Sequence, residues 1–114
     1  MSIHYMEIVT NDLDALCASY ENVYGLSFGA PEPDMGHARL ATQSDGSVLG
    51  IRKPLAGHEQ PTLRTYIEVA DIENAANAAE AAGAMIAYPP TRQGDHGMFA
   101  IYIQGDVQHG LWQR

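Results

Sequence analysis

Cysteine, basic residues and long apolar runs are scarce in this 114-residue sequence, and each scarcity excludes a class of protein. A single cysteine, Cys17, excludes an intramolecular disulfide and any zinc site built from several cysteines. Lysine and arginine number 6 against 14 acidic residues, so the net charge is −8. That charge argues against nucleic acid and anionic membrane surfaces as partners, because both attract basic patches. No apolar run approaches the roughly 18 residues that a membrane-spanning helix needs.

The first residues carry neither the basic nor the apolar region of a secretory signal, so we expect a cytoplasmic protein. Hydrophobic residues make up 46% of the chain, which is typical of a globular domain. The length corresponds to one domain.

Two segments of the chain share one layout. Residues 5–13 and 64–72 each alternate between apolar and polar positions and end in an aspartate followed by an aliphatic residue. This period of two predicts a β-strand. After each segment, apolar residues recur three or four positions apart, which predicts a helix that ends near Gly25 in the first case and near Gly83 in the second.

Three short strand patterns follow each of these glycines. They cover residues 26–30, 37–42, 47–52, 85–88, 97–103 and 109–113. The sequence therefore predicts an α+β fold in which a βαβββ unit occurs twice. We expect a single domain 1–114, with module one at 1–53, a linker at 54–62 and module two at 63–114.

This layout resembles the vicinal-oxygen-chelate superfamily, which includes glyoxalase I, extradiol dioxygenases and bleomycin-resistance proteins. Residues 19–26 are similar to the FY-x-x-V-FG signature after the first helix, and residues 97–113 are similar to the ending of a glyoxalase-like subgroup. The resemblance implies two βαβββ modules that form a curved, mostly antiparallel sheet around a cavity, with the helices outside. It also implies a homodimer.

The resemblance places metal ligands at four equivalent points of the sheet, and these fall on Tyr5, Gly50, Arg64 and Gly110. A phenol is a poor ligand for most divalent ions, arginine offers no lone pair, and glycine has no side chain. We therefore expect no metal and no cofactor. A divalent metal bound by other ligands, such as Glu7, Glu68 and a histidine, is the alternative.

Strand alternation predicts which side chains share the cavity face. They are Tyr5, Glu7, Arg52, Arg64, Tyr66, Glu68 and Trp112. Arginine and aromatic side chains together suit a small organic ligand with an anionic or hydroxyl group and an apolar body. We therefore predict that these seven residues bind a small-molecule substrate or ligand.

The catalytic residues are not identified by any motif. Glu7 and Glu68 are candidates for a general base if burial raises the pKa of either carboxyl group. The alternative is that Arg64 neutralises one of them. His96 lies in a polar loop, residues 91–97, that could cover the cavity, and Cys17 is expected to be a buried, inert thiol.

Three functions stay open at this point. The first is a metal-independent binding protein or enzyme, similar to bleomycin-resistance proteins, with a ligand in the concave sheet. The second is a metal-dependent lyase, isomerase or dioxygenase with non-standard ligands. The third is a structural or regulatory dimer whose cavity is filled by side chains.

Overall fold

The computed structural model describes residues 1–114, and the chain divides into two compact units. The first module is Tyr5–Leu63, and the second module combines Met1–His4 with Arg64–Arg114. Helices and strands follow one another in both, so the predicted α+β class is confirmed. No helix is long and apolar enough to cross a membrane. That the two modules form one domain stays a prediction.

The first module is built around a central strand. Its elements are β1 (Ile3–Val9), α1 (Leu13–Tyr24), the 3₁₀ helix η1 (Pro33–Met35), β2 (Arg39–Thr42) and β3 (Val48–Arg52). Strand β3 pairs in parallel with β1 and antiparallel with β2. The parallel register places Glu7 opposite Gly50.

One predicted strand of the first module, residues 26–30, is not formed. One backbone hydrogen bond joins the segment to β2, from the Gly29 N–H to the Leu40 carbonyl, and Arg39 of β2 adds a side-chain hydrogen bond to the Gly29 carbonyl. Pro31 and Pro33 follow directly, and because proline has no N–H, it cannot donate to a strand ladder. The chain instead turns into η1, which begins at Pro33.

The second module has all the predicted elements. They are β4 (Thr62–Glu68), α2 (Ile72–Ala81), β5 (Met85–Arg92), the 3₁₀ helix η2 (Gly94–His96), β6 (Met98–Gln104) and β7 (Val107–Gln113). Strand β7 pairs in parallel with β4 and antiparallel with β6, and β6 pairs antiparallel with β5. The β5 register shifts between Tyr88 and Thr91, where Pro89 and Pro90 lie.

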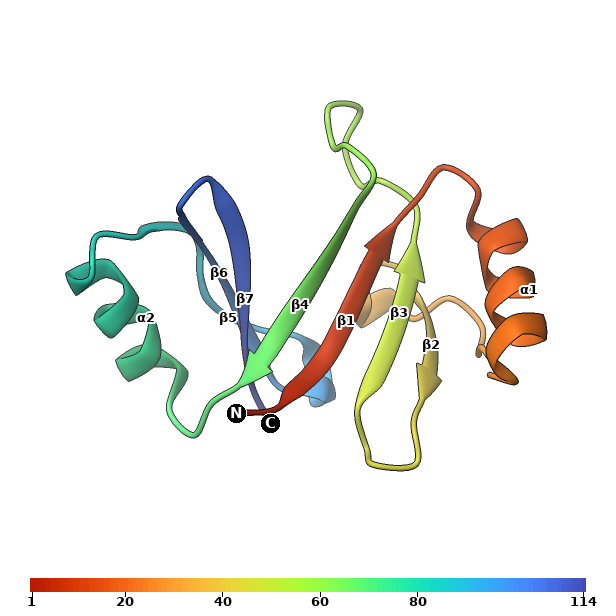
Figure 1. The fold of residues 1–114 in the computed structure, drawn as a ribbon, viewed down its shortest axis with the longest axis horizontal. Helices are drawn as coiled ribbons and strands as arrows, with labels where there is room; N and C mark the ends of the chain where they lie inside the picture. The colour runs from red at the N-terminus through yellow and green to blue at the C-terminus, as the bar shows by residue number, and fades with distance from the viewer. The chain divides into compact units, whose positions relative to one another are not determined.

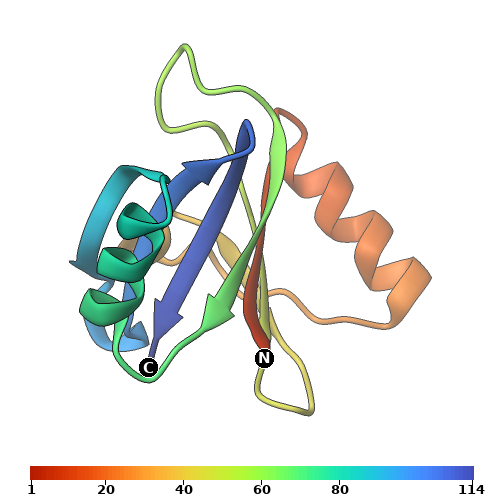
Figure 2. The same cartoon turned by 60° about the vertical axis from the view of Figure 1, so that its left-hand side comes forward.

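Each module has its own apolar core between one helix and one face of its strands (Figures 1 and 2). In the first module, Leu13 and Cys17 of α1 pack against Ile8, and Met6 lies beside them. In the second module, α2 packs against β5, β6 and β7 through Ile72 and other residues. Met6 and Ile8 therefore face the helix, and alternation directs the side chains on either side of them to the opposite face.

A glycine in the left-handed conformation ends α1, and an aspartate side chain caps the start of α2. Gly25 has φ +68° and donates its N–H to the Glu21 carbonyl, as predicted for a glycine after a helix. At the start of α2, the Asp71 carboxylate accepts a hydrogen bond from the Asn74 N–H at 3.0 Å. The strands β1 and β4, which carry candidate site residues, directly precede the two helices.

Candidate ligand-binding residues

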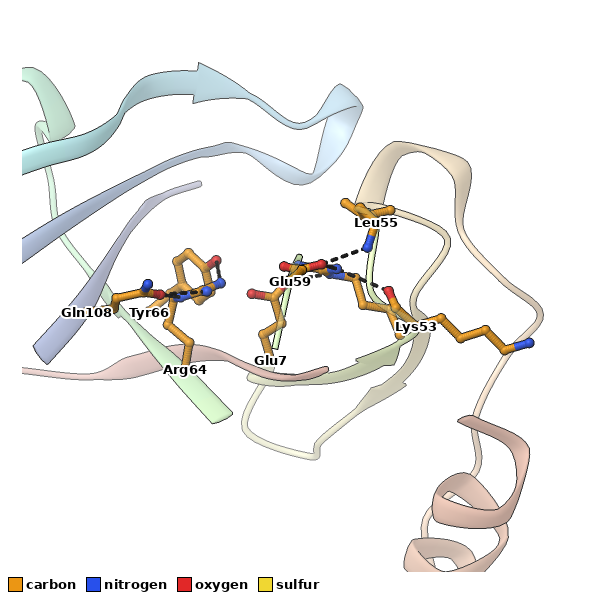
Figure 3. A network of polar contacts seen from close by, with 8 residues as sticks. Glu7, Lys53, Leu55, Glu59, Arg64, Tyr66 and Gln108 are labelled. Carbon is orange, nitrogen blue, oxygen red and sulfur yellow. Dashed lines mark hydrogen bonds and ion pairs between the residues drawn. The ribbon is translucent and has the colours of Figure 1, made fainter. Parts of the chain in front are cut away.

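Three charged side chains, two buried and one partly exposed, form a network in the first module (Figure 3). Arg52 on β3 donates from Nε to Glu7 Oε2 at 2.8 Å. The same guanidinium donates from Nη1 and Nη2 to the two oxygens of Glu59, each at 2.8 Å. Arg52 and Glu7 are only 5% and 7% exposed. The parallel pairing of β1 with β3 explains the contact, since Val9 aligns with Arg52 and Glu7 precedes it by two residues on the same face.

The charge of Arg52 is secured by its two carboxylate partners. Burial by itself lowers the pKa of the guanidinium, because it disfavours the charged form. Hydrogen bonds and charges from Glu59 and Glu7 outweigh burial and raise the pKa above its ordinary value. The network therefore consists of a permanent cation held between two carboxylates.

A second arginine lies on β4 of the second module (Figure 3). Arg64 is 8% exposed, and it donates from Nε and Nη2 to Gln108 Oε1 at 3.0 and 2.7 Å. Its Nη1 donates to the Tyr66 hydroxyl at 3.2 Å. An amide and a phenol thus fix the plane of the guanidinium, and each of its three nitrogens donates to one of them.

Aromatic rings gather beside Arg64 within the second module. Tyr66 meets Trp112 edge to face, with ring centroids 5.8 Å apart, and meets Phe99 at 6.3 Å. The ring centroids of His4 and Trp112 are 5.6 Å apart. Tyr66 and Trp112 are 4% and 2% exposed, so this cluster is packed as tightly as a core.

Tyrosine rings occupy the space beside two of the four positions where the resemblance places metal ligands. A Cβ atom at Gly50 would lie 2.6 Å from Cζ of Tyr5 and closer still to its hydroxyl. A Cβ atom at Gly110 would lie 2.6 Å from Cγ of Tyr66 and 2.7 Å from the carbonyl oxygen of Thr65. No carboxylate could extend from either glycine without displacing a ring.

The residues at these positions therefore do not fit a metal ion. Tyr5 and Arg64 bring a phenol and a guanidinium, and Gly50 and Gly110 bring no donor at all. Elsewhere in the chain, no three histidine, cysteine, aspartate or glutamate side chains gather so as to hold a metal ion.

Both candidate general bases are held by arginines. Glu7 accepts from Arg52, as described above. Glu68 pairs with Arg114 near the end of the chain, with 3.1 Å between Glu68 Oε1 and Nη2. The hydrogen bond from Arg114 lowers the pKa of Glu68, the opposite of the shift that a base active near neutral pH requires. Arg114, and not Arg64, is thus the guanidinium seen on Glu68.

Sequence reasoning missed three residues that shape these clusters, namely Glu59, Gln108 and Arg114. Glu59 lies in the predicted linker, Gln108 lies in β7 just before the predicted strand 109–113, and Arg114 is at the last position. None belongs to a periodic pattern, so periodicity could not identify them. The only signal was that buried arginines need partners.

A hollow of about 520 Å³ lies in the first module beside the segment that follows β3. It is lined by Asn11 together with residues 53–57 and 59–61. Its volume is in the range of small-molecule sites. No pattern in the sequence predicts this hollow.

The remaining candidates lie apart from these clusters. His96 ends η2 in the predicted loop. Cys17 is fully buried in the first core, and burial raises its pKa, with Arg39 opposing and Asp14 and Glu21 adding to the shift. A buried thiol with a raised pKa is a poor nucleophile.

Similarities to known proteins agree with this architecture. The sequence matches the glyoxalase/bleomycin resistance protein/dioxygenase superfamily over residues 2–108. None of the curated proteins matches it.

Solved structures share the fold at low identity. A hypothetical protein of Bacillus halodurans C-125 has a TM-score of 0.77 and 12% identity, covering 99% of this chain and 94% of its own. A methylmalonyl-CoA epimerase of Streptomyces coelicolor, with a bound 2-nitronate-propionyl-CoA, has a TM-score of 0.73 and 18% identity over 99% and 94%. The methylmalonyl-CoA epimerase of Mycobacterium tuberculosis has a TM-score of 0.73 and 16% identity over 97% and 86%. The predicted resemblance is confirmed: this chain belongs to the glyoxalase/bleomycin resistance protein/dioxygenase superfamily.

Proposed function

We propose that this protein binds a small organic anion without a metal ion. The observation that carries the proposal is the packing of Tyr5 over Gly50 and of Tyr66 over Gly110. The rings fill the space from which a metal-binding carboxylate would extend, so the superfamily's metal chemistry has no donor set at these positions. The same fold serves many functions, so the function has to be argued from the residues of the site.

The ligand class follows from the second module. Arg64, fixed by Gln108 and Tyr66, would bind a carboxylate or phosphate through its planar fork. Tyr66 and Trp112 would contact an apolar or aromatic body. In the first module, Tyr5, Glu7 and Arg52 form the corresponding polar cluster, and we include them among the binding residues together with Glu68.

A thermal-stability screen with carboxylates and phosphate esters tests this proposal. We expect one class of anion to raise the melting temperature, because a ligand that binds the native state stabilises it. The increase should be the same in chelator-treated protein and in protein supplied with Mn²⁺, Co²⁺, Ni²⁺ or Zn²⁺. Elemental analysis should find metal well below one equivalent per chain. Arg64→Lys should weaken the effect, since lysine cannot form the bidentate fork, while the exposed Arg92→Lys should not.

Stoichiometric metal, with anion binding that depends on it, would instead support a lyase, isomerase or dioxygenase that uses other ligands. Mutation of Glu7 and Glu68 would then be the next step.

A structural or regulatory role is the second candidate, and one observation favours it. Tyr5, Tyr66 and Trp112 are each at most 4% exposed, so the predicted ligand-binding rings are already packed. If no anion in the screen raises the melting temperature, this role is the better explanation.

We also propose a cytoplasmic homodimer. Strand β5 is the outer strand of the second module, and its Met85 and Tyr88 are more than half exposed. Exposed apolar edges are commonly covered in an assembly. Light scattering on the purified protein should give the mass of two chains, and the mass of one chain would contradict the dimer.

A further inference from the structure

The Glu59 carboxylate connects the segment that follows β3 to the first module, beside a hydrogen bond from Arg52 Nη1 to the Lys53 carbonyl at 3.2 Å. Glu59 accepts from Nη1 and Nη2 of Arg52 and, through Oε1, from the Leu55 N–H at 2.7 Å (Figure 3). The segment lies between Pro54 and Pro61. Glu59 therefore ties the middle of an otherwise exposed loop to a buried guanidinium.

The Arg52 guanidinium has the geometry of a complete carboxylate-binding site. Two parallel N–H···O bonds of 2.8 Å are the fork that arginine makes with a carboxylate ligand. The Nε–H is directed to Glu7, which orients the fork, and Nη1 also donates to the Lys53 carbonyl at 3.2 Å. Nothing in this arrangement requires that the bound carboxylate belong to the protein.

Space for a ligand lies next to that carboxylate. Glu59 lines the hollow of about 520 Å³, whereas Arg52 does not. Asn11 and Lys53 also line it, and they offer an amide and an ammonium group to a polar ligand. Glu59 thus contacts both the hollow and the guanidinium.

We propose that Arg52 is a binding site for a small organic carboxylate and that Glu59 occupies this site in the ligand-free protein. The incoming carboxylate displaces Glu59, accepts from Nη1 and Nη2, and leaves the Leu55 N–H without its present acceptor. The exchange replaces one carboxylate by another, so the charge around Arg52 does not change, and no buried charge is left uncompensated. This inference rests on the proposed anion-binding function and adds a regulatory contact to it.

An internal carboxylate competes with a ligand at an effective concentration in the millimolar range or above. Removing it should therefore tighten binding. We expect Glu59→Gln to bind benzoate, the probe, about tenfold or more tightly than the wild-type chain. Adding Arg52→Lys to that variant should reverse the gain. Asp14→Asn, which removes a carboxylate from the partly exposed Arg39, is the matched control and should bind as the wild type does.

A measurement on the unmodified protein keeps the test independent of how the variants fold. Amide hydrogen exchange at Leu55 should become faster at saturating benzoate, because Glu59 has left. Benzoate affinity that is equal in the wild type and Glu59→Gln, binding without a change at Leu55, or no binding to Glu59→Gln would each overturn this inference.

The two proposals fail separately. If anions stabilise the wild-type chain through Arg64 but leave Leu55 exchange unaltered, the proposed function stands and the role of Glu59 is wrong. If no anion binds any variant, both are wrong.

Discussion

The phenol ring of Tyr5 lies over Gly50, so that these two residues of neighbouring strands fill one space. Tyr66 and Gly110 repeat the relationship in the second module with a different register: Gly110 aligns with Tyr66 itself, whereas Gly50 aligns with Glu7. The same two residue types thus close the equivalent position of both modules. We conclude that these glycines are required by the rings that cover them, since neither has a positive φ.

Gly50→Ala should destabilise the first module by about 1–3 kcal/mol, because the new methyl group would overlap the Tyr5 ring in a packed region. Urea denaturation followed by circular dichroism measures the loss. Tyr5→Phe should recover part of it in the double variant, since it removes the hydroxyl, which is the atom nearest the new Cβ.

Gly57→Ala is the control for this substitution. Its Cβ would meet nothing within 4 Å, so the free energy of unfolding should change by no more than about 0.5 kcal/mol. Equal costs for Gly50→Ala and Gly57→Ala would refute the steric explanation.

Glu7→Gln should destabilise the protein by about 1–3 kcal/mol, because it weakens a charged hydrogen bond to the buried Arg52. The loss should stay below the cost of leaving a buried charge without any partner, since Glu59 keeps its own contact with the guanidinium. Urea rather than guanidinium is the denaturant of choice because it adds no ionic strength.

A surface ion pair provides the comparison for Glu7. Asp14 pairs with Arg39 at 3.3 Å, and its side chain is 90% exposed. Asp14→Asn should therefore change stability by less than about 0.5 kcal/mol. If both substitutions prove equally mild, the Glu7–Arg52 contact contributes little to the fold.

The strands and helices could be predicted because their signals are local. The alternation in residues 64–72 predicted β4, and its aspartate caps α2 through its side chain. The strand expected at 26–30 failed for a reason also visible in the sequence, the prolines at 31 and 33. Proline cannot donate to a strand ladder, and this local effect outweighs the expected repeat of strands.

Only some of the site residues could be predicted from the same local signals. Alternation placed Glu7 and Arg52 on one face, and the structure joins them. The partner Glu59 lies in the predicted linker and Gln108 in β7 just before the predicted strand 109–113, 7 and 44 positions from the arginines that they bind. Only the fold brings such residues together, and a single sequence carries no periodic signal for them.

The Glu68–Arg114 pair predicts a pH dependence of stability. Arg114 lowers the pKa of Glu68 from its ordinary value of 4.5, so the carboxylate is favoured in the folded state. The stabilisation is fully present above pH 4.5 and is lost as the pH falls through the lower pKa of the folded state. An NMR titration of the Glu68 side-chain carboxyl should give a midpoint below 4.5 in the wild type.

Arg114→Gln should return that midpoint to the ordinary range while the other glutamates titrate as before. The pair is exposed, so 1 M salt should also weaken the shift. A midpoint that is unaffected by either change would show that Arg114 does not act on Glu68.

Cys17 should be unreactive in the folded protein. Its side chain is fully buried against α1 neighbours and β-strand residues, and burial raises the pKa of the thiol from 9.0, so little thiolate forms at pH 8. We expect a disulfide reagent such as DTNB to modify the native chain at least about 100-fold more slowly than the urea-unfolded chain, because the reaction needs local opening of the core. Since Cys17 is the only cysteine, the absorbance change reports on this thiol alone.

The variant that combines Cys17→Ala with Ser19→Cys places the thiol at an exposed position of the same helix and should react rapidly without denaturant. Rapid modification of native Cys17 would mean that α1 separates readily from the strands of the first module, and the core described around it would not be the resting state of the protein.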